Sequence, residues 1–247
     1  MEQNKLTFHY AVASDYEGLS KLAAETIIEQ VKKKPDSLLC LAAGSTPTGT
    51  LNYLAEAAKR NEVDFSNCYI VGLDEFVGLS WEDEGSCYRY VNEFFFEPLN
   101  ISKDRIHFFK AQVDDLEKEC DETDRYIQEH GGIDVLLLGV GVNGHLGLNE
   151  PNVSLNLNSH VIELEATTKK VGQKYFSEAK KLEKGITIGL KQVLESKTVV
   201  VIANGPLKKE AMAALLKGSV DEKYPVSCLN LHENCFVYVD KEANPEI

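Results

Sequence analysis

The chain has 247 residues, of which 43% are hydrophobic and 26% are charged, and its formal net charge is −13. Nucleic acid carries a dense negative charge, so this balance argues against nucleic acid as a partner. No apolar run approaches the roughly 18–20 residues of a membrane span, and Met1–Lys5 lacks the apolar block of a signal peptide. We therefore expect a globular, cytoplasmic protein without a membrane partner.

Short apolar runs alternate with longer amphipathic ones from end to end. An apolar period near 3.6 residues predicts a helix from Ser14 to about Lys34, with Ser14 and Glu17 as its capping box. Further helices are predicted over residues 51–60, 86–96, 115–130, 168–179 and 207–217. Strands are predicted over residues 6–12, 38–43, 68–73, 106–109, 133–139, 159–165, 198–203 and 235–239.

The apolar runs predict the fold class. Leu38–Ala43 is apolar throughout, as expected of a parallel strand that is buried on both faces. Strands that alternate with helices predict an α/β fold, here a doubly wound, mainly parallel, Rossmann-like sheet with helices on both faces. Ile133–Gly139 is expected to be its central strand. No linker, charge block or repeat interrupts the pattern, so residues 1–247 are expected to form a single domain.

Polar turns follow four of the predicted strands, and the carboxyl ends of parallel strands meet at one edge of a sheet. The first turn, Gly44-Ser45-Thr46, opens a helix with backbone N–H groups that suit an anion. Asp74 ends the next strand, and Lys208 lies at the start of the last predicted helix. Each turn is also compatible with an ordinary capped turn, and for Glu75 we prefer that structural role. The turn Gly44–Gly49 is neither a P-loop nor the dinucleotide-binding G-x-G-x-x-G motif.

The stretch Gly139–Pro151 combines glycines with three functional polar groups. Asn143, His145 and Glu150 supply an amide, an imidazole and a carboxylate within eight residues. Histidine can move a proton, and a neighbouring carboxylate would orient it and stabilise its charged form. With Asp74 and the anion cradle, this set suits proton transfer on a small phosphorylated molecule. A glycine-rich turn without chemistry is the alternative interpretation.

The six cysteines are dispersed, and no two of them form a C-x-x-C pair. Without a secretion signal they are expected to be reduced thiols, and a zinc site would need tighter Cys/His spacing. We therefore expect no metal and no cofactor.

Three motifs in register resemble the glucosamine-6-phosphate deaminase/isomerase family: Leu41–Pro47, Leu73–Leu79 and Gly139–Pro151. The resemblance extends over nearly the whole chain in order. It implies the aldose–ketose isomerisation of a 2-amino-2-deoxyhexose 6-phosphate with loss of ammonia, and thus a small hexosamine phosphate as the binding partner. The oligomeric state is left open, with a homo-oligomer as one option.

The resemblance also implies a role for each matching residue. Asp74 matches the base that moves a proton between C2 and C1. His145 matches the group that opens the sugar ring, and Glu150 matches its carboxylate partner. Phosphate contacts are implied for Lys174 and Lys208 and for the backbone amides of Gly44, Ser45 and Thr46.

Two positions depart from the family pattern. Asn143 stands where the glucosamine enzymes usually carry aspartate, which favours the galactosamine-6-phosphate branch with tagatose 6-phosphate as product. Because asparagine holds no charge, Glu150 is expected to carry more of the support of His145. Lys174 stands where the family often has arginine, so the charge is kept but bidentate phosphate geometry is lost. The C-terminus is short compared with that of allosteric hexameric members of the family, so allosteric regulation is not carried over, and its presence is left open.

Other functions are weighed against this one. The first alternative is glucosamine 6-phosphate as substrate, with fructose 6-phosphate and ammonia as products. A second is lactone hydrolysis of the 6-phosphogluconolactonase type, which occurs on the same fold. A third is a non-catalytic sugar-phosphate sensor, which the absence of a basic helix-turn-helix segment disfavours.

Overall fold

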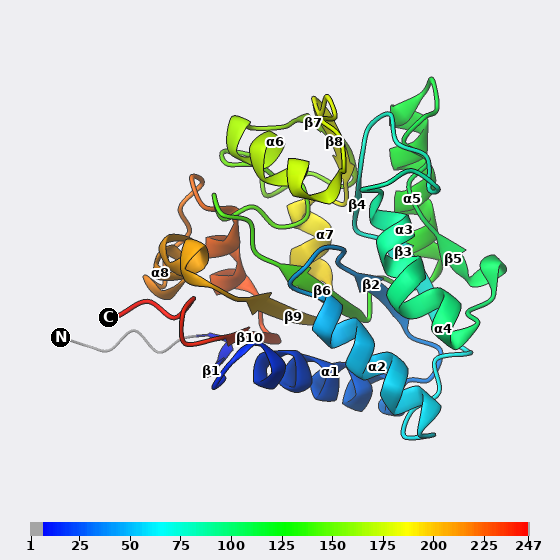
Figure 1. Ribbon diagram of the computed structural model, residues 1–247, viewed down its shortest axis with the longest axis horizontal. Helices are drawn as coiled ribbons and strands as arrows, with labels where there is room; N and C mark the ends of the chain where they lie inside the picture. The colour runs from blue at the N-terminus through cyan, green and yellow to red at the C-terminus, as the bar shows by residue number, and fades with distance from the viewer. Residues whose placement is uncertain (1–6, 247) are drawn as a thin grey trace.

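The computed structural model describes residues 7–246. Its core is a sheet of seven parallel strands in the order β1-β10-β9-β6-β2-β3-β5 (Figure 1). The strands are β1 (His9–Val12), β2 (Leu38–Leu41), β3 (Tyr69–Gly72), β5 (Ile106–His107), β6 (Val135–Gly139), β9 (Thr198–Ala203) and β10 (Cys235–Val239). The fourth position in this order belongs to β6, so the predicted central strand is confirmed.

Side chains of the central strands alternate between the two faces of this sheet. In β2, Leu39 and Leu41 belong to the hydrophobic cluster on one face, and Leu38 and Cys40 belong to the cluster on the other. All four are buried, because both faces are covered by other elements. Burial on both faces explains why this strand is apolar at every position, since each fully buried leucine contributes about 1.5–3 kcal/mol.

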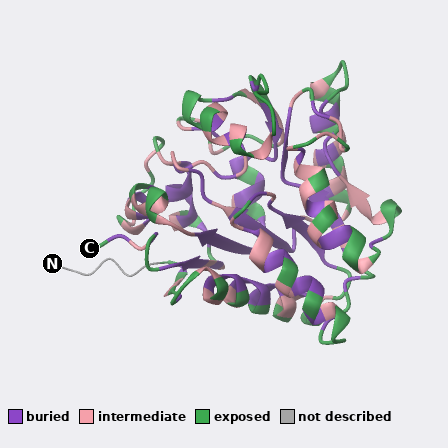
Figure 2. Ribbon diagram, in the orientation of Figure 1, coloured by how far each residue is buried: buried purple, intermediate pink, exposed green. Residues whose placement is uncertain are grey.

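Helices cover both faces, which confirms the doubly wound α/β class. The helices of one face are α1 (Tyr16–Lys33), α2 (Thr48–Lys59), α3 (Cys87–Val91), a π-helical turn η1 (Asn92–Phe96) and α4 (Glu97–Leu99). The other face carries α5 (Leu116–Glu129), α7 (Leu190–Glu195), α8 (Lys209–Leu216) and the 3-10 segment η5 (Pro225–Leu231). Figure 2 shows the strands buried between these layers and the outer helix surfaces exposed.

A second, smaller sheet lies above the carboxyl edge of the first, and the sequence did not predict it. It consists of β4 (Asp74–Phe76), β8 (Lys184–Thr187) and β7 (His160–Glu163) in antiparallel order. The chain leaves the main sheet after β3 and enters this one at Asp74, which pairs with Thr187. With the helix α6 (Ala166–Gly172), it forms the upper part of the molecule in Figure 1.

The predicted cap of the first helix is wrong by one residue. The N-cap is Asp15, whose carboxylate accepts a 2.8 Å hydrogen bond from the backbone N–H of Gly18. The Ser14 hydroxyl instead donates to the Asp15 carboxylate. Asp15 therefore satisfies the free N–H of the first turn, and Glu17 falls one position short of completing a capping box.

Two other helices differ from prediction in their length or regularity. The helix predicted over 86–96 continues to Leu99 but contains the π-helical turn η1, whose Phe95 and Phe96 are core residues. The helix predicted over 168–179 ends early, because α6 passes into a 3-10 turn η3 (Gln173–Tyr175). The side chain of Gln173 bonds both backbone groups of Lys180, so the intervening chain folds back instead of continuing the helix.

Candidate active site

The turns at the carboxyl edge of the main sheet enclose a cavity of about 830 Å³. The turns after β2, β3, β6 and β9 all contribute to its lining. This agrees with the prediction that these turns meet at one edge of the sheet. The lining contains eight of the nine predicted site residues: Gly44, Ser45, Thr46, Asp74, Asn143, His145, Lys174 and Lys208. Glu150 is the ninth, and it lies behind His145 with 2% of its surface exposed.

Asp74 places a buried carboxylate in this cavity, at the point where the chain passes between the two sheets. Burial and, to a smaller extent, the neighbouring carboxylate of Glu75 raise its pKa to about 7, and these effects outweigh the opposite effect of the contact with the Cys87 thiol. Neither of these two neighbours is a cation, so neither of them compensates for the buried negative charge. A carboxylate with a pKa near neutrality can both accept and return a proton at physiological pH.

Glu75 has the structural role that the sequence favoured. Its carboxylate is fully buried and accepts hydrogen bonds from the Ser86 hydroxyl at 2.8 Å and from the backbone N–H groups of Phe76 and Cys87. These contacts attach the start of α3 to β4, which fixes the backbone beside Asp74.

His145, Glu150 and Asn143 form one connected group. The distance from His145 Nδ1 to Glu150 Oε2 is 3.6 Å, and Asn143 Nδ2 donates to the same carboxylate oxygen at 2.8 Å. The other oxygen accepts the backbone N–H of Glu165 at 3.0 Å. Burial would raise the pKa of Glu150, but His145, the Thr168 hydroxyl and the Glu165 amide outweigh it and lower the pKa to about 2. Glu150 is therefore a permanent negative charge beside the imidazole.

The glycine at position 141 permits this arrangement. A Cβ atom at Gly141 would lie 2.4 Å from Cδ2 of His145, so the imidazole lies flat against a backbone without a side chain. The turn after β6 thus positions the histidine through the close approach that glycine allows.

The opposite side of the cavity suits an anion. Lys174 Nζ donates to the Ser45 hydroxyl at 3.1 Å. Burial and, to a smaller extent, the positive charge of Lys174 lower the pKa of Lys208 to about 8. The ammonium groups of the half-buried Lys208 and the exposed Lys174 repel each other, and a bound dianion such as a phosphate would stabilise both.

Backbone turns support this anion side. Gly44 has φ of +110°, and a Cβ there would lie 2.8 Å from the Tyr175 hydroxyl, so both conformation and space require glycine. The Thr46 hydroxyl donates to the side-chain oxygen of Asn204 at 2.6 Å, which ties the first turn to the one that carries Lys208.

Sequence reasoning missed several residues of this site. Thr168 and Tyr175 come from α6 and η3, and no local motif marked them. Asp240 is buried beyond the end of β10, where its carboxylate accepts the backbone N–H of Gly205 at 3.0 Å and fixes the turn before Lys208. Asp240 could have been predicted from the sequence, because it is a carboxylate that directly follows the predicted strand over residues 235–239.

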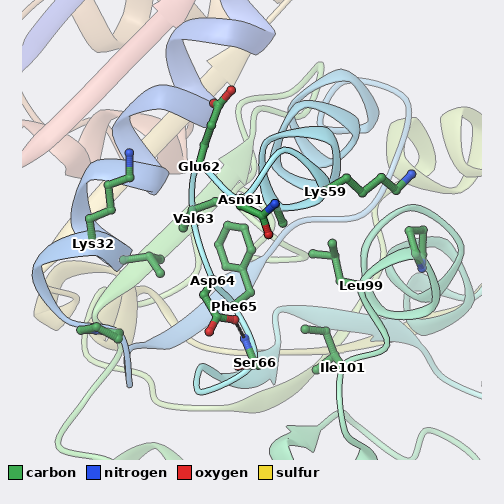
Figure 3. Close-up of a pocket in the computed structure, with 14 residues that line it drawn as sticks. Lys32, Lys59, Asn61, Glu62, Val63, Asp64, Phe65, Ser66, Leu99 and Ile101 are labelled. Atoms are coloured by element: carbon green, nitrogen blue, oxygen red, sulfur yellow. Dashed lines mark hydrogen bonds between the residues drawn. The ribbon is translucent and has the colours of Figure 1, made fainter.

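A second cavity of about 620 Å³ lies where α1 and α2 end (Figure 3). Its charged side chains, such as Lys32, Lys59 and Glu62, are exposed to solvent, and its buried ones, such as Val63 and Phe65, are apolar. Buried polar groups that converge on a ligand distinguish the first cavity from this one.

Within residues 7–246, no three His, Cys, Asp or Glu side chains are grouped so that they could hold a metal ion. In the same part of the chain, no helix has the length and apolarity needed to cross a membrane.

The fold and the cavity define an α/β protein whose cavity, at the carboxyl edge of a parallel sheet, brings together a carboxylate, an imidazole and two lysines. The family model for glucosamine-6-phosphate isomerases/6-phosphogluconolactonase matches residues 14–238. The chain belongs to this family.

Individual relatives agree with this membership. A glucosamine-6-phosphate deaminase from a Thermoanaerobacter species is 39% identical over 233 residues, which are 94% of this chain and 92% of the relative. One from Bacillus velezensis is 39% identical over 229 residues, which are 92% of this chain and 95% of the relative. These relatives are glucosamine enzymes, so the expected galactosamine branch gains no support and the glucosamine alternative is the better supported one.

Solved structures show the same relationship. A monomeric glucosamine-6-phosphate deaminase matches with a TM-score of 0.92 and 36% identity, over 95% of this chain and 98% of its own. A 6-phosphogluconolactonase from Thermotoga maritima matches with a TM-score of 0.75 and 19% identity, over 95% of this chain and 100% of its own, which shows a shared fold.

Proposed function

We propose that the protein converts glucosamine 6-phosphate and water into fructose 6-phosphate and ammonia. The observation that carries this proposal is the buried Asp74 carboxylate in the cavity, with its pKa near 7. The reaction needs one group that first removes a proton from carbon and then returns it to the next carbon. A carboxylate with this pKa suits both halves of that task.

Ring opening is assigned to His145. In this scheme the imidazole takes the proton of the C1 hydroxyl and delivers it to the ring oxygen, so that the C1–O5 bond breaks and an aldehyde forms. Nδ1 faces Thr168 and Glu150, which leaves Nε2 as the nitrogen available to the sugar. The charge of Glu150 stabilises the imidazolium that forms between the two transfers.

Isomerisation is assigned to Asp74. It removes the proton from C2 of the open-chain sugar, the electron pair moves toward C1, and the C1 oxygen takes up a proton from the 2-ammonium group, which gives a neutral enolamine. Return of the proton to C1 gives an imine at C2. Water adds to that carbon, ammonia leaves, and the ketose remains.

The phosphate is assigned to Lys174, Lys208 and the turn Gly44–Thr46, whose contacts support this placement. Asn143, which suggested the galactosamine branch, donates its amide to Glu150. This contact supports the proposed ring-opening pair, so Asn143 is compatible with either sugar. Glucosamine and galactosamine differ only in their configuration at C4.

A side-by-side assay tests the substrate. Glucosamine 6-phosphate and galactosamine 6-phosphate are supplied at equal concentrations, and both ammonia and the ketose phosphate are measured. We expect kcat/KM to be at least tenfold higher for the glucosamine epimer. Preference for galactosamine 6-phosphate would restore the interpretation from Asn143, and hydrolysis of 6-phosphogluconolactone without ammonia release would replace the proposal altogether.

A further inference from the structure

The ring-opening pair is not in direct hydrogen-bond contact. The 3.6 Å between His145 Nδ1 and Glu150 Oε2 is longer than a hydrogen bond. Thr168 Oγ1 lies closer to the imidazole, at 3.2 Å from the same nitrogen, and its side chain is buried. We propose that Thr168 is a positioning residue that links His145 to Glu150 and thereby makes ring opening depend on the placement of α6. This inference rests on the proposed function.

The hydroxyl can serve both neighbours at once. A threonine hydroxyl accepts one hydrogen bond while it donates another. In the proposed arrangement it accepts the Nδ1–H of His145, which lies 3.2 Å away, and donates to the carboxylate of Glu150, whose pKa Thr168 lowers. That arrangement fixes the tautomer with the proton on Nδ1 and leaves Nε2 free to receive the proton of the sugar.

The position of Thr168 in its helix explains why the hydroxyl is available. Threonine in a helix interior usually bonds the carbonyl four residues earlier, as Thr123 does with Glu119 in α5. Thr168 is the third residue of α6, so the residue four positions earlier lies outside the helix. Its hydroxyl points across the chain instead, to a residue 23 positions away.

The same segment also reaches the anion side of the cavity. The backbone N–H of Glu165 holds Glu150, and Lys174, just beyond α6, contacts Ser45. A phosphate bound by Lys174 would therefore hold the segment that carries Thr168, and so would couple phosphate binding to the orientation of the imidazole.

The test replaces Thr168 in the full-length chain. Thr168→Val keeps the branched shape and removes the hydroxyl, and we expect kcat for glucosamine 6-phosphate to fall about 10- to 100-fold, as for the loss of a hydrogen bond to a charged group. KM should stay within about threefold. The inhibition constant of 2-amino-2-deoxyglucitol 6-phosphate, which cannot form a ring, should also stay within about threefold of the wild-type value. Thr168→Ser should restore kcat to within about threefold.

A matched control removes another buried hydroxyl that contacts a histidine. Thr123→Val deletes a group 2.9 Å from His107 Nε2, far from the cavity, and should leave kcat unchanged. Thermal unfolding of every variant is measured in parallel. If Thr168→Val does not fold, Thr168→Ala removes the same hydroxyl with less bulk and carries the test.

Two results would overturn the inference: wild-type kcat in the valine variant, or a serine variant as impaired as the valine variant while both melt normally. Failure of the proposed function looks different, because the wild-type protein would then release no ammonia from either hexosamine phosphate.

Discussion

At the scale of single residues, the cavity gathers groups whose ionisation is set by burial and by each other. Asp74 has its pKa raised to about 7, Glu150 has its pKa lowered to about 2, and Lys208 has its pKa lowered to about 8. The carboxylates of Asp74 and Glu150 therefore differ in their ionisation. Glu150 stays charged and supports an imidazole, whereas Asp74 is poised to gain and lose a proton, as expected of a general base.

Asp74→Asn should abolish turnover, with kcat reduced at least about 10³-fold, because the amide cannot accept the proton from C2. In the wild type, kcat should fall about tenfold per pH unit below about pH 7, as Asp74 becomes protonated. Steady-state assays of both proteins from pH 5 to 9 check this. Near-normal turnover of the asparagine variant would show that another group is the base.

The same substitution should raise stability at alkaline pH. The pKa of Asp74 is about 7 in the folded protein and about 4 in the unfolded chain. Asp74 therefore contributes most to the stability of the wild-type protein below about pH 4, where it is neutral in both states, and this contribution is lost as the pH rises from about 4 to about 7. Ionising this buried group costs roughly 4 kcal/mol at the ordinary energy of about 1.4 kcal/mol per pKa unit. The always neutral asparagine avoids this cost, so its melting temperature should exceed that of the wild type at pH 8 but not at pH 4. Equal melting temperatures at pH 8 would contradict the high pKa.

At the scale of the elements, the turn after β6 determines where the imidazole of His145 lies. Gly141 leaves the imidazole room against the backbone, Asn143 holds Glu150, and the peptide of Gly141 accepts the backbone N–H of Gly144 at 3.0 Å to close the turn. The position of the His145 imidazole therefore depends on the shape of a short loop at the end of the central strand.

Gly141→Ala should separate this effect from folding. The added Cβ would come within 2.4 Å of the His145 ring, which can move into the cavity at little cost to the fold but would then leave Thr168 and Glu150. We expect kcat to fall at least about 100-fold, while the melting temperature changes by only a few degrees. A variant that keeps its activity would show that the ring tolerates displacement, and a variant that fails to fold would show that the turn is rigid.

At the scale of the whole molecule, the two edges of the main sheet carry different groups of polar residues. The carboxyl edge carries the cavity, and the amino edge carries a buried carboxylate that is held by two partly exposed lysines. Asp134, at the start of β6, accepts hydrogen bonds from Lys197 at 2.7 Å, from Lys34 at 2.9 Å and from the backbone N–H of Leu38 at 2.8 Å. One carboxylate thus joins segments next to β2, β6 and β9, the three central strands.

Asp134→Ala should lower the unfolding free energy by about 1–3 kcal/mol, because a buried backbone N–H loses its partner and two lysines lose theirs. KM and kcat should stay within about twofold, since this carboxylate lies at the edge opposite the cavity. Burial would raise the pKa of Asp134, but Lys197, the Leu38 amide and Lys34 outweigh it and lower the pKa. Its stabilising effect is therefore present above about pH 4 and is lost as the pH falls through the lowered pKa. Denaturation by urea at pH 7 and pH 3 tests this, and a cost that is equal at both values would argue against the ionic role.

Much of this molecule could be predicted from its sequence, because the predicted parts depend on local physical chemistry. Apolar runs such as Leu38–Leu41 require burial on both faces, and that requirement predicts a parallel sheet covered by helices. The strand-to-turn pattern also placed Asp74, His145 and Lys208 at one edge, where they line the same cavity.

Other features depend on contacts between segments far apart in the chain, which no local pattern records. Strand β4 pairs with β8 more than a hundred residues later, so the small sheet and the position of Asp74 between the sheets emerge only in the folded molecule. The link from Thr168 to His145 and the ionisation of Asp74, Glu150 and Lys208 have the same origin, since burial and neighbouring charges are tertiary properties. The sequence by itself determined the sheet, its covering helices and the residue types at its carboxyl edge, whereas only the tertiary structure decided which of those residues touch and which carry a charge.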